Sequence, residues 1–144
     1  MEEAKKDPKK ILIVDDNRDS RELIVKILKG RGYQIIEAID GEEALEKVVA
    51  ERPDLILMDI SIPKIDGYEV TRRLKAQEEF KGIPVVALTA HAMKGDREKA
   101  LEAGCEGYIS KPINVRELPE LIKSYLKGKW ESILNYRFDK PQES

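Results

Sequence analysis

The chain has 144 residues, enough for a single domain that buries a core of its own. Hydrophobic residues make up 41% of it and charged residues 38%, a composition typical of a soluble globular protein and not of a disordered or membrane-spanning one. The formal net charge is −2, so no overall basic field is available to hold nucleic acid or an anionic membrane. We therefore expect neither of these partners.

The N-terminal segment, residues 1–8, is a polar tail without the apolar stretch of a secretion signal, and the apolar runs further on are too short to span a bilayer. The single cysteine, Cys105, has no second cysteine with which to form an internal disulfide. These features favour a cytoplasmic protein in which Cys105 is a small packing residue.

Short runs rich in Ile, Val and Leu alternate along the chain with stretches of helical periodicity. The predicted strands are residues 11–14, 33–39, 54–60, 83–90 and 107–110. The first predicted helix carries Leu23 to Leu28 and ends at Gly30 to Gly32, and the second starts at Gly41 and is closed by Pro53. The third runs from Gly67 to Leu74, with an optional extension to Phe80. The fourth covers 94–104, and the fifth covers 115–126, with Pro119 near its first turn. Continuous apolar strands linked by helices predict a parallel sheet buried on both faces, which is a doubly wound α/β domain.

Acidic residues follow two of the predicted strands. Asp15 and Asp16 come directly after the first strand, in ILIVDDN, and Asp59 lies at the end of the third. In doubly wound sheets, ligands bind at the carboxyl ends of the strands. If the first and third strands are neighbours, as in the sheet order 2-1-3-4-5, the carboxylates converge and repel one another unless a cation neutralises them. An all-oxygen ligand set favours Mg²⁺ or Mn²⁺, and one His with one Cys is too few for a zinc site.

Two further residues are predicted at the same edge of the sheet. Thr89 follows the fourth strand and Lys111 the fifth. A hydroxyl, an ammonium and a metal ion around a carboxylate make a site for a phosphoryl group, which Asp59 could attack in line to form an acyl phosphate. Taken singly, these residues have ordinary explanations, as helix caps, turn residues or surface charges. Their joint placement at the ends of four strands favours a site.

The segments ILIVDDN (11–17), LILMDISIPKIDGYEV (55–70), PVVALTAHAMKGD (84–96) and GYISKPI (107–113) together resemble the receiver domain of bacterial two-component response regulators. The resemblance covers residues 9–127. It implies a flavodoxin-like fold, with a five-stranded parallel sheet in the order 2-1-3-4-5 and helices on both faces. It also implies that Asp59 accepts a phosphoryl group from a phosphohistidine, either on a histidine kinase or on a histidine phosphotransfer protein.

The same resemblance implies further roles at the site. Asp15, Asp16, Asp59 and the backbone carbonyl of Ser61 would hold Mg²⁺, and Thr89 and Lys111 would contact the phosphoryl oxygens. Tyr108 matches an aromatic switch position, and the Lys111–Pro112 bond matches one that is usually cis. Ser61 and His91 match positions that tune the lifetime of the phosphate, although an exposed loop histidine explains His91 equally well.

Phosphorylation adds about two negative charges to an edge that already carries three carboxylates. The metal ion and Lys111 can balance these charges only if Thr89 and its loop move towards the phosphoryl group. We therefore predict that this loop and the side chain of Tyr108 change position on phosphorylation. The face made by the fourth helix, the fifth strand and the fifth helix is expected to change with them and to bind a downstream target protein.

Two other functions remain open from the sequence. A Mg²⁺-dependent phosphohydrolase also uses an Asp nucleophile, but such enzymes commonly place a second acid two residues later, where this chain has Ser61. A receiver that serves as a constitutive scaffold is the third option.

Residues 128–144 form an extension too short for an output domain, so we expect a stand-alone receiver or one excised from a longer protein. Helical spacing is kept by its apolar residues Trp130, Ile133, Leu134 and Phe138. This spacing predicts a helical turn or two that packs on the domain, with a role in docking or dimerisation as the alternative.

Overall fold

The computed structural model describes residues 8–90 and 94–127. The predicted extension over 128–144, most of the N-terminal tail and His91 lie outside the described residues. The strands are β1 (Lys10–Val14), β2 (Gln34–Ala38), β3 (Leu55–Asp59), β4 (Val85–Thr89) and β5 (Gly107–Ser110), and the helices are α1 (Arg18–Leu28), α2 (Gly41–Glu51), α3 (Gly67–Lys75), α4 (Lys94–Ala103) and α5 (Glu117–Leu126).

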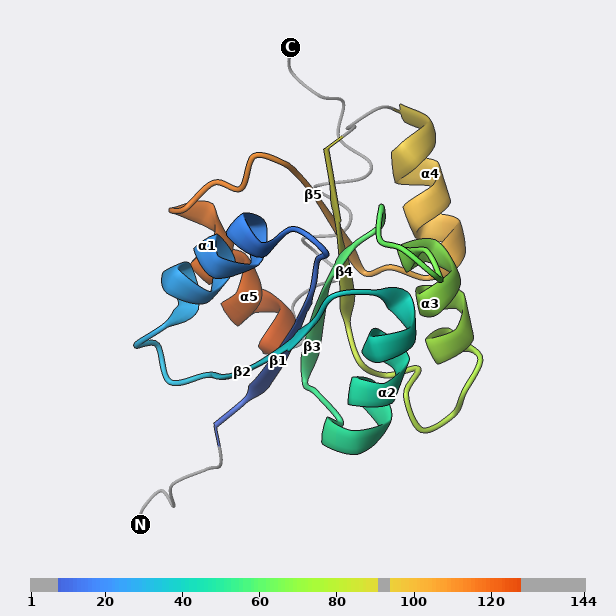
Figure 1. Ribbon diagram of the computed structural model, residues 1–144, viewed down its shortest axis with the longest axis horizontal. Coiled ribbons are helices and arrows are strands. Elements are labelled where there is room, and N and C mark those ends of the chain that lie inside the picture. Colours follow the sequence, from blue (N-terminus) through green and yellow to red (C-terminus); the bar gives the residue numbers. More distant parts are fainter. Residues whose placement is uncertain (1–7, 91–93, 128–144) are drawn as a thin grey trace.

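All pairings between the strands are parallel, and the sheet order is β2-β1-β3-β4-β5. Helices α1 and α5 cover one face of the sheet, and α2, α3 and α4 cover the other (Figure 1). The predicted flavodoxin-like, doubly wound α/β fold is therefore confirmed. Every strand runs towards the same edge, so the loops that follow the strands gather there.

The sheet has a separate hydrophobic core on each face. Along β1, Leu12 and Val14 pack into the core beneath α2, α3 and α4, while Ile11 and Ile13 pack into the core beneath α1 and α5. All four side chains are fully buried. Successive side chains of a strand point to opposite faces, so a strand covered by helices on both sides must be apolar throughout.

Several element ends differ from the prediction. Helix α3 ends at Lys75, and Phe80 lies in the turn that follows instead of extending the helix. The ring of Phe80 is nonetheless buried, with the guanidinium of Arg52 5.4 Å from its centroid. Phe80 is apolar because residues distant in sequence bury it, and not because it belongs to the buried face of a longer α3. Pro119 is the third residue of α5, within the first turn as predicted.

The first three helices begin at this same edge behind polar caps. The side chains of Asn17, Asp40 and Asp66 each accept a hydrogen bond from a backbone N–H three residues later, at 2.9, 2.7 and 2.9 Å respectively. Such caps satisfy amide groups that the first helical turn leaves unpaired. They fix the points at which the chain leaves the loops and enters the helices.

The loop between β3 and α3 is packed tightly against its surroundings. The N–H of Gly41, at the start of α2, donates to the carbonyl of Pro63 at 3.2 Å, and a Cβ on Gly41 would overlap the carbonyl of Ile65. At Gly67, a Cβ would lie 2.7 Å from the Cα of Ile60. Two glycines therefore let this loop lie directly on α2 and β3.

Within residues 8–90 and 94–127, no helix combines the length and the apolar character that crossing a bilayer requires.

Candidate functional site

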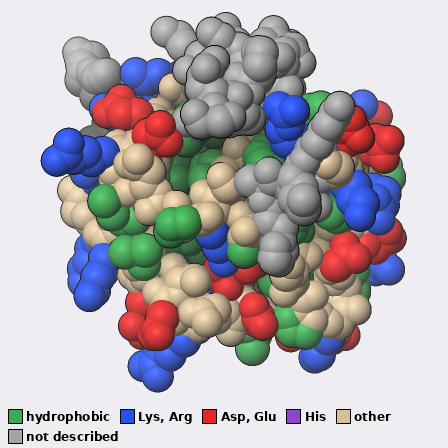
Figure 2. Space-filling view, turned by 90° about the horizontal axis from the view of Figure 1, so that it is seen from above, with side chains coloured by type: hydrophobic (Ala, Val, Ile, Leu, Met, Phe, Trp, Pro, Cys, Tyr) green, Lys and Arg blue, Asp and Glu red, His purple; other side chains and the backbone are tan. Residues whose placement is uncertain are grey.

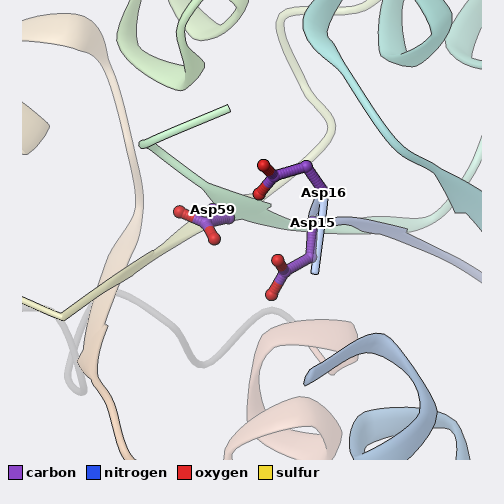
Figure 3. A group of neighbouring side chains, drawn as sticks. All are labelled: Asp15, Asp16 and Asp59. Atoms are coloured by element: carbon purple, nitrogen blue, oxygen red, sulfur yellow. The ribbon is translucent and has the colours of Figure 1, made fainter. Parts of the chain in front are cut away.

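Three aspartates meet at the carboxyl edge of the sheet. Val14 of β1 is in register with Met58 of β3, so Asp15 and Asp59, the next residues, come out side by side. One carboxylate oxygen from each of Asp15, Asp16 and Asp59 lies within 4.8 Å of the others. The side chains extend from the two neighbouring strand ends towards a common region (Figure 3). Adjacent parallel strands thus bring together acids that lie more than forty residues apart in the chain.

Lys111 reaches into this cluster from the loop after β5. Its Nζ lies 3.0 Å from Oδ2 of Asp15 and 3.0 Å from Oδ2 of Asp59. The lysine comes from the far side of β4, whose Thr89 carbonyl accepts a hydrogen bond from the Lys111 N–H at 2.7 Å. An ammonium group therefore bridges two of the three carboxylates and offsets their repulsion.

The two bridged carboxylates are held in the same way. Oδ1 of Asp15 accepts a hydrogen bond from the N–H of Asn17 at 2.9 Å, and Oδ1 of Asp59 accepts one from the N–H of Ser61 at 2.8 Å. Each acid therefore has one oxygen on a backbone amide and the other on Lys111. Both carboxylates are fixed in rotation, whereas the side chain of Asp16 is exposed.

The ionisation of the cluster follows from its burial. Asp15 is 0% exposed, and desolvation raises its pKa more than the hydrogen bonds from Asn17 and Lys111 lower it, with the charge of Asp59 adding to the rise. Desolvation alone would lower the pKa of Lys111, but its hydrogen bonds to Asp15 and Asp59 outweigh this and raise that pKa. The site therefore favours the charged form of Lys111, whereas burial disfavours the charged form of Asp15.

The structure also describes Thr89, Tyr108 and Ser61, three further residues predicted at the site. Thr89 ends β4 and is 2% exposed, and Tyr108, on β5, is 7% exposed and belongs to the core under α2, α3 and α4. Ser61 is exposed, two residues after Asp59. The Lys111–Pro112 peptide bond is cis, as the resemblance implied.

An apolar cavity of about 340 Å³ adjoins the cluster. It is lined by Ser20, Leu23, Ala90, Lys111, Pro112 and Ile113. Figure 2, which looks onto the carboxyl edge of the sheet, shows charged side chains near the centre of this face with hydrophobic side chains beside them. The sequence prediction did not include this cavity, because its lining comes from helix α1, the loop after β4 and the loop after β5, which are distant from one another in the chain.

Sequence reasoning also missed Arg21, on α1. Its guanidinium donates to the backbone carbonyl of Asp15 at 3.0 Å. Its place one helical turn inside α1 carries no motif that would have marked it out, and only the fold shows that the helix faces back onto the Asp15 turn.

The chemistry of the donor groups is that of a hard-cation site. Carboxylate oxygens converge at an edge open to water, which is the ligand set that Mg²⁺ and Mn²⁺ prefer. An ammonium group and a hydroxyl-bearing side chain lie at the same edge. Together these groups are able to neutralise the charge of a phosphoryl group next to a carboxylate nucleophile.

Comparison with known proteins points the same way. The family model of the response regulator receiver domain matches residues 11–123. The chain is 50% identical over 119 residues to the polar-differentiation response regulator DivK of Brucella anthropi, an alignment that covers 83% of this chain and 97% of that protein. The DivK of Brucella ovis is 49% identical over 118 residues, which is 82% of this chain and 96% of that one.

Solved structures share the fold. A putative response regulator from Chloroflexus aurantiacus superposes with a TM-score of 0.80 at 34% identity, covering 83% of this chain and 98% of that one. The receiver domain of the sensor histidine kinase PA1611 from Pseudomonas aeruginosa, crystallised with a magnesium ion coordinated in its active-site cleft, gives a TM-score of 0.77 at 38% identity with the same coverage. The chain therefore belongs to the family of response regulator receiver domains, and it is a module of phosphorylation-controlled signalling in two-component systems and not a classical enzyme.

Proposed function

We propose that Asp59 is the residue on which this receiver is phosphorylated and that the phosphoryl donor is a histidine kinase or a histidine phosphotransfer protein. The observation that carries the proposal is the position of the Asp59 carboxylate, which contacts the Lys111 ammonium at 3.0 Å and has an oxygen within 4.8 Å of those of Asp15 and Asp16. A carboxylate oxygen of Asp59 forms a bond to phosphorus while the bond from phosphorus to the donor's imidazole nitrogen breaks. The imidazole nitrogen keeps the electron pair of the broken bond.

Mg²⁺ belongs to the same proposal, with Mn²⁺ as a substitute. Asp15, Asp16 and Asp59 would hold it through their carboxylates, and Ser61 would contribute its backbone carbonyl. The magnesium ion in the receiver domain of PA1611 supports this assignment. The ion supplies positive charge to the phosphoryl oxygens.

Lys111 and Thr89 complete the proposed phosphoryl site. With the phosphoryl group in place, Lys111 exchanges part of its contact with Asp15 and Asp59 for a phosphoryl oxygen, and the Thr89 hydroxyl donates to another. Slow loss of the phosphoryl group to water follows, at a rate that the side chains of Ser61 and His91 tune. Residues 9–127 are the bounds we propose for the receiver domain, and the buried free thiol of Cys105 is in keeping with the reducing cytoplasm in which we place it.

The output we propose is a change on the face formed by α4, β5 and α5, where a target protein binds. Thr89 and Tyr108 lie on the paired strands β4 and β5, so a movement of Thr89 towards the phosphoryl group acts directly on the neighbouring strand. Amide chemical shifts over residues 94–127 should therefore change on addition of Mg²⁺ and a phosphoryl analogue. Unchanged shifts there would contradict this coupling.

The experiment that tests the phosphorylation is intact mass spectrometry after incubation with Mg²⁺ and acetyl phosphate. We expect one added phosphoryl group on the wild type and none on Asp59→Asn. Asp66→Asn is the matched control, because Asp66 lies in the same loop region and its role as a helix cap is one that asparagine also performs. An adduct on Asp59→Asn, or its absence from Asp66→Asn, would contradict the assignment.

A further inference from the structure

Arg21 is a half-buried cation beside the acidic site, and its described hydrogen bonds include one to the backbone of that site and none to its carboxylates. Its side chain is 15% exposed. Nη1 donates to the carbonyl oxygen of Asp15 at 3.0 Å, and Nε donates to Oε1 of Glu37 at 3.0 Å. One guanidinium therefore links α1, the turn after β1 and the neighbouring strand β2.

The carbonyl that Arg21 binds belongs to the peptide that joins Asp15 to Asp16. Because a peptide unit is planar, a fixed carbonyl also fixes the direction in which the chain enters the next residue. Asp15 itself is held in addition by its N–H, which donates to the carbonyl of Ala38 at 3.1 Å, and by its buried side chain. Asp16 has an exposed side chain, so the orientation of this peptide is what aims it.

Glu37 makes the arrangement compatible with a cation site. An unpaired guanidinium next to three carboxylates would compete with a metal ion for their charge. Pairing with Glu37 offsets that charge and also holds the guanidinium at a fixed position on β2, one residue before Ala38. The hydrogen-bond geometry of Arg21 is thus kept while its repulsion towards a metal ion is reduced.

We propose that Arg21 is a positioning residue for the metal site, and that it preorganises the exposed carboxylate of Asp16 by holding the Asp15–Asp16 peptide against β2. The inference rests on the proposed binding of Mg²⁺ by Asp15, Asp16 and Asp59. Groups that orient metal ligands from outside the coordination sphere commonly change metal affinity by about 10- to 100-fold when they are removed.

The test is the Mg²⁺ affinity of Arg21→Gln, measured by calorimetry on the unphosphorylated protein. We expect binding about tenfold weaker than in the wild type. Arg18→Gln is the matched control, because Arg18 lies on the same helix, is 81% exposed and pairs with Glu22 at the surface. Loss of a positive charge alone would tighten Mg²⁺ binding in both variants. Weaker Mg²⁺ binding in Arg21→Gln alone is therefore a change opposite in direction to the effect of the lost charge.

A spectroscopic readout separates positioning from loss of fold. In the metal-free protein, the amide resonance of Asp16 should shift or broaden in Arg21→Gln, while the amides of Leu57 and Val86, in the middle of the sheet, stay in place. Arg18→Gln should leave all three unchanged. A general loss of structure would move the sheet amides as well, and that outcome would overturn the inference.

Arg21→Lys keeps the charge but replaces the planar fork by a single ammonium group, so it should recover only part of the lost affinity. Binding equal to the wild type in Arg21→Lys, or in Arg21→Gln, would overturn the inference and leave the proposed function intact. Failure of the wild type itself to bind Mg²⁺ would instead overturn the proposed metal site, and the inference with it.

Discussion

Lys75 and Lys111 are both half-buried lysines that bind carboxylates, at opposite edges of the sheet, and the difference between them separates scaffold from site. Nζ of Lys75 donates to Oε2 of Glu106 at 2.8 Å and to the carbonyls of Lys81 and Ile83 at 3.0 and 2.7 Å. Its three protons are thus all used, on one acid and two backbone groups. Oε1 of Glu106 in turn accepts from the N–H of Val85 at 2.8 Å.

The carboxyl edge is balanced differently. There Lys111 bridges Asp15 and Asp59, and Asp16 adds a third carboxylate within 4.8 Å. The Lys75–Glu106 pair at the amino edge is matched charge for charge, while the carboxyl edge holds more acid than Lys111 neutralises. A surplus of buried or crowded charge destabilises a fold, so it persists where a ligand can relieve it.

Lys75→Met should give the largest loss of stability, about 3 kcal/mol in the free energy of unfolding, because it leaves the Glu106 carboxylate and two carbonyls without their donor. Methionine keeps the apolar stem on which Gly104 packs. Urea unfolding measures the effect. The control is Lys81→Met, an exposed lysine paired with Glu78, which should change stability by no more than about 0.5 kcal/mol. Equal effects in the two variants would remove the distinction between the half-buried Lys75–Glu106 pair and the surface pair Lys81–Glu78.

Lys111→Met should destabilise the metal-free protein by about 2 kcal/mol, since the three carboxylates then face one another without a cation. Saturating Mg²⁺ should bring the stability back close to that of the wild type, because the ion replaces the missing charge. In Lys75→Met, whose metal site is intact, Mg²⁺ should stabilise the protein as much as it stabilises the wild type, so the deficit relative to the wild type should stay unchanged. If Mg²⁺ raised the melting temperatures of the wild type and Lys111→Met by the same amount, lysine and ion would not be interchangeable counter-charges.

Asp15→Asn should stabilise the metal-free protein by about 1 kcal/mol, because it removes a fully buried charge that another carboxylate repels. It should also abolish the stabilisation by Mg²⁺. Asp54→Asn is the counterpart at the other end of β3. Its carboxylate accepts from the N–H of Lys10 at 2.8 Å; asparagine still accepts this bond but as a neutral group, which is a weaker acceptor, so we expect a loss of about 1 kcal/mol. Melting curves with and without Mg²⁺ decide, and equal Mg²⁺ shifts in wild type and Asp15→Asn would contradict the idea.

The smallest expected effect is a pH dependence of the difference in stability between Asp15→Asn and the wild type. The pKa of Asp15 in the folded protein is raised above its usual 3.8, so the folded state binds the proton more tightly than the unfolded one. The contribution of Asp15 to stability therefore falls as pH rises from 3.8 through the folded pKa, and it stays low above that. Without Mg²⁺, the advantage of Asp15→Asn over the wild type should be greatest near neutral pH and vanish towards about pH 4. An advantage that did not change with pH would assign it to packing.

Much of the architecture follows from local pattern. The five apolar runs and the residues that follow them were sufficient to predict a parallel sheet with Asp15, Asp59 and Lys111 at one edge, because strand direction fixes which ends meet. The helix ends were less accessible. Phe80 carried the period of α3 and yet belongs to the turn after it, since contact with Arg52 and the core determines its burial.

The contacts that distinguish this chain's site were not in the pattern at all. That Lys111 takes the place of a counter-ion between two particular carboxylates, and that Arg21 binds a backbone carbonyl six residues back, depend on side-chain reach across packed elements. The Lys75 and Glu106 pair is likewise thirty-one residues apart in sequence. Charged residues on helices are usually solvated, so sequence alone gives no reason to select Arg21 or Lys75 among the many charged residues on helices.

The close approach at Gly41 limits which sequences this fold can use. Even one methyl group at residue 41 would overlap the carbonyl of Ile65. The start of α2 and the loop bearing Ser61 therefore pack so closely that only glycine fits at this position. In a library randomised at residue 41 and selected for phosphorylation, glycine should be the survivor, even though the position lies on a different strand–helix unit from Asp59. A residue that touches no substrate and carries no side chain would then rank with the acids in mutational sensitivity.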